Sequence, residues 1–294
     1  MSSRALALAL CGIVTLASGC ATQTIQEGKD LSTTGITYTD AVDSLLDVTT
    51  DAVIEFDNKE LLKGRVSTNP RAGLEERDAA MLDLLGQITV FRAQTKLLKA
   101  YFLSLQALAD STVKDDAGAA VKSLSDSINK VNASLGGEAK LSDDQKTQLG
   151  ALAGLAASSV QAQKIKRAFS RDAKIIGTNL ALQQRQLANI TDILRSRYEA
   201  DNTLFLEERV VKPYADLHGT FDASAWSDAR SQWLKRAFVN EQLAAANTAA
   251  AQLTSVWADI LQGKTDLNAL DGLISDVNEF VAAVQTFKAA KSDH

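Results

Sequence analysis

The sequence predicts an all-α protein, an elongated antiparallel bundle of about six or seven helices with coiled-coil-like packing. Three observations indicate this fold class. Only two prolines, Pro70 and Pro213, interrupt the 294 residues, and proline is the strongest helix breaker. Residues that favour helix, such as Ala, Leu, Gln, Lys and Glu, dominate most of the chain. Apolar residues recur at spacings of three and four, and the alternation typical of strands does not occur.

After a first helix predicted from Asp40 to Lys63, four segments carry apolar residues at alternating spacings of four and three. Helices with this pattern bury one stripe against their neighbours at shallow crossing angles. The predicted core positions are Leu84, Ile88, Phe91, Thr95, Leu98, Phe102, Leu105 and Ala109 in the helix from Glu75 to Asp110; Ala117, Val121, Leu124, Ile128, Val131 and Leu135 in the next; Leu243, Ala246, Ala250, Leu253, Trp257 and Ile260 between Asn240 and Leu261; and Leu267, Leu270, Ile274, Val277, Val281 and Val284 in the last.

A long helical segment begins near Lys166 and reaches Lys212 without an internal proline. If it is continuous, its roughly 46 residues span about 70 Å, but the sequence leaves its continuity open. The stretch YADLHGTFDAS at 214–224 then turns the chain, and either Asp222 or Ser224 is expected to cap the next helix.

The first 19 residues have the composition of an export signal. Arg4 is the only charged residue among them, and an apolar run from Ala5 to Ala17 follows it. A membrane-spanning helix needs roughly 20 apolar residues, so this run is too short to cross a bilayer.

The stretch Leu16-Ala17-Ser18-Gly19-Cys20 ends this run, and it resembles the lipobox of bacterial lipoproteins. The resemblance implies cleavage before Cys20, a diacylglycerol on its sulfur and a further acyl chain on its amino group. It also implies, for a Gram-negative cell, that Ala21 directs the protein to the outer membrane, facing the periplasm. The alternative is an ordinary secretory signal with a chance cysteine.

The polar residues 20–36, rich in Thr and Gly, are predicted to form a flexible tether behind the acylated cysteine. A flexible chain of this length has a mean reach of roughly 20–25 Å. Residues 37–294 are then expected to form a single helical-bundle domain.

Composition argues against several classes of function. The net charge is −5 and no basic tract occurs, so nucleic acid is not an expected partner. The lipobox resemblance implies that Cys11 is removed with the signal and that Cys20 is acylated, so no disulfide is expected. Only His218 and His294 could serve as histidine ligands or bases, and no nucleophile elbow, P-loop or paired Glu-x-x-His motif is present. We therefore predict no catalytic residue, no metal and no cofactor, and no enzyme activity.

The function favoured by these observations is that of a lipid-anchored interaction, scaffold or accessory protein that docks a protein partner in the cell envelope. The three tryptophans fall in one predicted helix, and Trp226 and Trp233 share a face because they are seven residues apart; these two are the candidate partner contact. One alternative is a ligand-binding or sensor bundle with a buried polar cluster. A less favoured alternative is an envelope enzyme that uses carboxylates alone. In the ligand-binding or sensor alternative, the residues that could form the buried polar cluster are Asn179, Gln183 and Asn189.

Mass spectrometry of the protein purified from its native envelope is expected to find Cys20 as the amino-terminal residue, carrying three acyl chains. The reason is the lipobox resemblance of residues 16–20. A bare Cys20, or a Cys20 still joined to Gly19, would contradict the predicted anchor.

Overall fold

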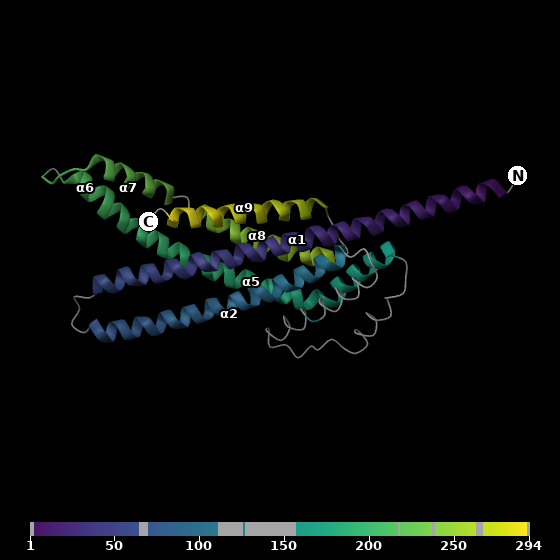
Figure 1. Ribbon diagram of the computed structural model, residues 1–294, viewed down its shortest axis with the longest axis horizontal. Helices are drawn as coiled ribbons and strands as arrows, with labels where there is room; N and C mark the ends of the chain where they lie inside the picture. Colours follow the sequence, from purple (N-terminus) through teal and green to yellow (C-terminus); the bar gives the residue numbers. More distant parts are fainter. Residues whose placement is uncertain are drawn as a thin grey trace. The chain divides into compact units, whose positions relative to one another are not determined.

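The computed structural model describes residues 3–64, 70–110, 126, 157–216, 218–236, 239–262 and 267–292. In these ranges the chain forms seven α-helices and one short π-helix, and no strand (Figure 1). The all-α prediction is therefore confirmed, whereas the helix predicted from Asp116 to Leu135 lies, apart from Asp126, outside the described residues. The elements are α1 (Ser3–Gly64), α2 (Pro70–Asp110), α5 (Ala157–Phe205), the π-helix η2 (Leu206–Val211), α6 (Lys212–Ala215), α7 (Ala223–Arg236), α8 (Val239–Leu261) and α9 (Leu267–Ser292).

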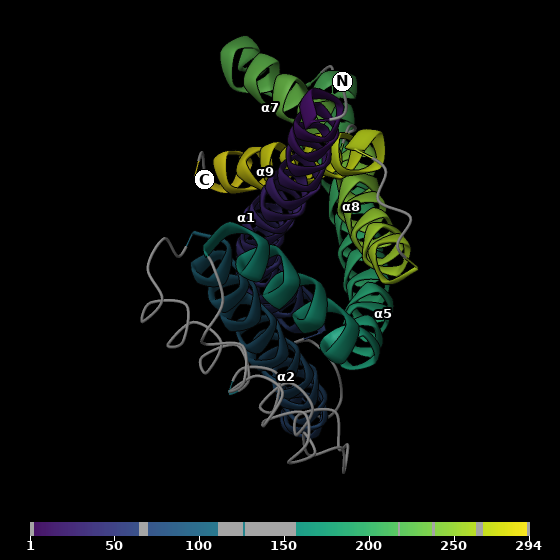
Figure 2. The same cartoon turned by 90° about the vertical axis from the view of Figure 1, so that its right-hand side faces the viewer.

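The chain divides into two compact units, each composed of three separate segments. Unit 1 consists of Met1–Asp40, Gln94–Leu182 and Ala251–Ser275, and unit 2 consists of Ala41–Ala93, Gln183–Ala250 and Asp276–His294. Both units draw on α1, α2, α5, α8 and α9, which can be followed in Figure 2. The single domain expected for residues 37–294 stays a prediction.

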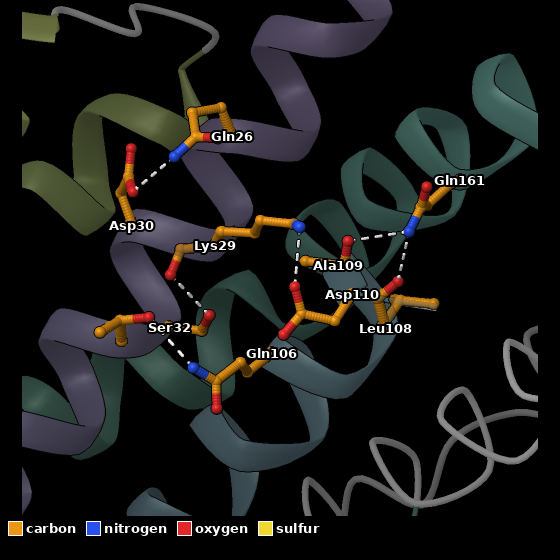
Figure 3. Close-up of polar contacts among 10 residues, drawn as sticks. Gln26, Lys29, Asp30, Ser32, Gln106, Leu108, Ala109, Asp110 and Gln161 are labelled. Carbon is orange, nitrogen blue, oxygen red and sulfur yellow. Dashed lines mark hydrogen bonds and ion pairs between the residues drawn. The ribbon is translucent and has the colours of Figure 1, made fainter. Parts of the chain in front are cut away.

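In unit 1, α1 and α2 run antiparallel, and Figure 3 shows polar contacts between them near Lys29 and Asp110. The ammonium of Lys29 lies 2.8 Å from the carboxylate of Asp110, and Lys99 pairs with Asp40 further along both helices. Because the residue numbers rise on α1 while they fall on α2, the predicted antiparallel packing is confirmed for this pair.

A side chain in the first turns of α5 hydrogen-bonds to the carboxyl end of α2. The side-chain amide of Gln161 donates hydrogen bonds of 3.0 Å and 2.9 Å to the carbonyls of Leu108 and Ala109 (Figure 3). The last carbonyls of a helix have no partner within that helix, so Gln161 supplies the donors that α2 lacks. This contact places α5 against the carboxyl end of α2.

Residues 22–36 are helical rather than a flexible tether, and this corrects the sequence prediction. Leu31 and Ser32 are completely buried in unit 1. The Ser32 hydroxyl donates to the carbonyl of Lys29, and the Thr34 hydroxyl donates to that of Asp30 over 2.7 Å. Since these hydroxyls bond to their own helix, they can be buried without losing a partner. Composition alone suggested a loop because Thr, Ser and Gly have modest or low helix propensities.

In unit 2, α1 pairs with α2 and also with α5. The guanidinium of Arg77 lies 2.7 Å from the carboxylate of Asp57, and Lys59 lies 2.9 Å from Asp201 of α5. The guanidinium of Arg197 on α5 also stands 4.5 Å from the centre of the Phe56 ring, within cation–π range. Charged side chains thus bridge α1 to both neighbours within this unit.

The predicted core stripe of α2 is confirmed from Ile88 to Ala109, where all seven positions are buried. The stripe of α8 is confirmed from Leu243 to Trp257. The stripe of α9 is partly wrong, because Ile274 and Val281 are only half-buried. Two apolar stripes overlap on α9, and the one with the larger side chains is buried, since burying more apolar area releases more free energy. The buried positions of α9 are Leu270, Leu273, Val277, Phe280, Ala283, Val284 and Phe287.

The segment from Lys166 to Lys212 follows a helical path throughout. Helix α5 ends at Phe205, the π-helix η2 continues to Val211, and α6 begins at Lys212. The continuity left open by the sequence is therefore established, with one local change of helix type near its end.

Replacing Gly35 with alanine is expected to lower the free energy of unfolding by about 1–3 kcal/mol, as overpacking of a core does. A Cβ atom at this position would lie 2.6 Å from atoms of the buried Phe102 ring. Chemical denaturation followed by circular dichroism measures the change.

The matched control is Gly86→Ala, because a Cβ at Gly86 would meet no atom within 4 Å. This substitution is expected to raise stability by about 0.5–1 kcal/mol through helix propensity alone. Equal effects at both positions would contradict the close packing of α1 against α2 at Gly35.

Candidate functional site

The three tryptophans do not share one helix, which corrects the sequence prediction. Trp226 and Trp233 lie on α7, whereas Trp257 lies on α8. Trp257 is only 1 % exposed and belongs to the core of unit 1. Trp226 and Trp233 are both half-buried, so the candidate partner contact has to be sought on α7.

Trp226 forms an exposed aromatic cluster with Tyr214 and Phe221 in unit 2. The rings of Trp226 and Tyr214 are stacked, with centroids 5.1 Å apart and planes inclined by 26°. Phe221 lies 6.0 Å from Trp226 and 6.4 Å from Tyr214. Tyr214 is 66 % exposed and Phe221 is 49 % exposed, so two of the three rings present large apolar faces to solvent. Trp233 lies two turns further along α7 and is not part of this cluster.

The turn between α6 and α7 is built on two aspartates. The Asp216 carboxylate accepts hydrogen bonds from the backbone N–H groups of His218 and Gly219, over 3.0 and 3.1 Å. Asp222 accepts one from the N–H of Ala225 over 3.0 Å, so Asp222 rather than Ser224 caps α7. These bonds order the backbone between Tyr214 and Trp226 and thereby set the positions of the rings.

The indole of Trp226 is fixed from the side of the π-helix. Its N–H donates a 3.0 Å hydrogen bond to the carbonyl of Val210, which is itself buried. A phenylalanine could stack equally well but could not make this bond, because the indole is an amphipathic ring with one donor. π-Helical turns frequently occur at functional sites, and here the turn supplies the acceptor that holds the cluster.

Charge around the cluster is mixed. The guanidinium of Arg230 stands 6.0 Å from the Trp226 ring, at the outer limit of a cation–π contact. Glu207 and Glu208 are exposed on η2, and Arg209 and Lys212 are exposed beside them. With both signs so close together, no strong field of one sign covers the rings, and their apolar faces are the distinctive feature of this surface.

Sequence reasoning found Trp226 but missed Tyr214 and Phe221. The available signal was the pair of aromatic residues on either side of a polar turn, at the end of a helix that contains Pro213. His218, which lies in this turn, contributes only its exposed backbone N–H to the bonding described here. Within the described ranges, no group of three or more His, Cys, Asp or Glu side chains could hold a metal ion.

The predicted polar cluster of α5 is only partly present. Asn179 and Gln183 are each completely buried, but Asn189 is exposed. Asp172 of unit 1 is also buried, and Arg171 Nη2 lies 2.7 Å from its Oδ2 atom. Burial raises the pKa of Asp172, and the neighbouring Arg171 opposes this rise. Unit 1 therefore contains buried polar groups that the aromatic cluster does not involve.

Cys20 falls within α1, but its side chain lies outside the described residues. None of the helices in the described part of the chain combines the length and apolar character needed to cross a bilayer. No family model matches the chain, and no curated protein and no solved structure is significantly similar to it.

Replacing Trp226 with phenylalanine is expected to lower the free energy of unfolding by about 1 kcal/mol, the usual value of one hydrogen bond. The ring is kept, but the carbonyl of Val210 loses its indole donor. The control is Trp233→Phe on the same helix, which should change stability by less than about 0.5 kcal/mol. Denaturant unfolding gives both values, and an equal loss in the two variants would contradict the special role of Trp226.

Proposed function

We propose that this protein is a lipid-anchored component of the cell envelope that binds a protein partner through the cluster of Tyr214, Phe221 and Trp226. It carries out no chemistry of its own in this proposal. The observation that carries it is the exposure of Tyr214 and Phe221, at 66 % and 49 %. Aromatic residues are enriched at protein interfaces and dominate their binding energy.

The order of the cluster supports a role in binding. Tyr214 stacks on Trp226, and Trp226 is hydrogen-bonded to Val210. Binding costs free energy when side chains must become ordered, so rings that are already held in place lose less on docking. A flexible pair of exposed rings would lack this advantage.

The anchor in this proposal is Cys20, acylated after removal of residues 1–19. Two or more acyl chains hold a protein stably at a membrane. The outer membrane of a Gram-negative cell is the proposed location, with the helices in the periplasm, and the partner is then a periplasmic or outer-membrane protein. The mixed charge around the cluster favours a protein partner over a strongly anionic lipid surface.

The test places a photoreactive amino acid at position 221 of the full-length protein in its native cell. The expected result is a crosslink to one protein, and this crosslink should be lost when Tyr214→Ser and Trp226→Phe are added. The matched control carries the probe at Leu82, which is 69 % exposed on α2 of the same unit. The control should not capture the same protein.

Two outcomes would contradict the proposal. A crosslink from position 221 to lipid alone would indicate that the cluster contacts the membrane. Identical products from positions 221 and 82 would indicate that the cluster has no preference for the captured protein. Circular dichroism of each variant checks that the helices are intact.

A further inference from the structure

Asn179 of α5 is completely buried in unit 1, yet its side chain has no hydrogen-bond partner among the described residues. Neither its donor Nδ2 nor its acceptor Oδ1 is paired. Leaving a buried polar group unsatisfied costs about 1–3 kcal/mol, and native proteins pair the great majority of such groups with protein or with bound water. An amide with both atoms unpaired therefore indicates that something else binds there.

A further unpaired atom belongs to α2 of the same unit. Gln94 is only 8 % exposed, and its Oε1 lacks a partner in the described part of the chain. The Tyr101 hydroxyl, two turns further along α2, is completely buried. It is near enough to the Asp172 carboxylate for that charge to add to the rise that burial causes in its pKa.

The register of α2 and α5 brings Gln94 and Asn179 to the same level of the helix pair. The two helices run antiparallel, because Gln161 contacts Leu108 and Ala109 while Asp172 lies near Tyr101. Gln94 precedes Tyr101 by seven residues, and Asn179 follows Asp172 by seven. Two turns correspond to about 10 Å along each axis, so Gln94 and Asn179 lie at the same level of the antiparallel pair.

Apolar side chains enclose this level. Leu98 and Ile176 are completely buried between the Tyr101 level and the Asn179 level. The Trp257 ring stands edge-on to Tyr101, with centroids 6.0 Å apart, and a Cβ on Gly177 would lie 3.7 Å from it. The unpaired atoms are thus separated from bulk solvent, and a molecule bound to them would exchange slowly.

We propose that Asn179 and Gln94 form an internal site in unit 1 for a small uncharged molecule that both donates and accepts hydrogen bonds. Water meets this description, and so does a small solute with a hydroxyl or amide group. The molecule must be uncharged because Arg171 already neutralises Asp172, and an isolated extra charge in such a place is very costly. The proposal does not depend on the aromatic cluster of unit 2.

The first experiment examines the full-length protein with ¹⁵N-labelled asparagine and glutamine. Water at the site gives magnetisation transfer between a long-lived water and the Asn179 side-chain amide, which is assigned by its loss in Asn179→Leu, or in Asn179→Ser should the leucine variant not fold. A solute instead gives an added mass in native mass spectrometry of the wild type, absent after denaturation. Either signal supports the proposal and identifies the source, and the absence of both overturns it.

The second experiment compares Asn179→Leu with Asn189→Leu, which makes the same change at an exposed position of the same helix. Relative to this control, Asn179→Leu is expected to lower the midpoint of thermal unfolding by about 2–8 °C, because it expels the molecule and leaves Gln94 unpaired. A rise relative to the control would show that the amide was a dry, unsatisfied group, and the internal site would be ruled out.

Discussion

A polar atom removed from water costs about 1–3 kcal/mol unless it regains a hydrogen bond, and this cost governs which faces the helices of this protein can bury. Ser32 and Thr34 meet it by donating to carbonyls of their own helix. The side-chain amide of Gln161 donates to a carbonyl at the end of α2, and the indole N–H of Trp226 donates to the carbonyl of Val210. Asn179 and Gln183 are completely buried without such a partner among the described residues.

The sequence was sufficient to predict those helices whose apolar residues form one clear stripe. The predicted stripe positions from Ile88 to Ala109 on α2 are buried, because large side chains such as Phe91, Leu98 and Phe102 continue that stripe without a break. On α9 the stripe through Ile274 and the stripe through Leu273 overlap, and the choice between them depends on neighbouring helices. Residues 22–36 were misjudged for a different reason, since hydroxyls that bond within a helix cannot be recognised from composition.

Of the three rings in the candidate site, only Trp226 was predictable from the sequence. Trp226 was an obvious candidate because tryptophan is rare and often buried at interfaces. Tyr214 and Phe221 reach it only because Asp216 and Asp222 order the turn between α6 and α7. Such ordering depends on the backbone geometry at each aspartate, which a sequence pattern of polar turn residues does not specify.

The early start of helix α1 changes how the protein would meet a bilayer. Thr24 is already 6 % exposed within unit 1, and it follows Cys20 by four residues, about 6 Å along a helix. With a lipidated cysteine at that distance, the segment between the lipid anchor and unit 1 would be very short. Unit 1 would therefore lie at the level of the lipid headgroups. Its freedom to tumble would then be restricted to rotations about a short, stiff attachment.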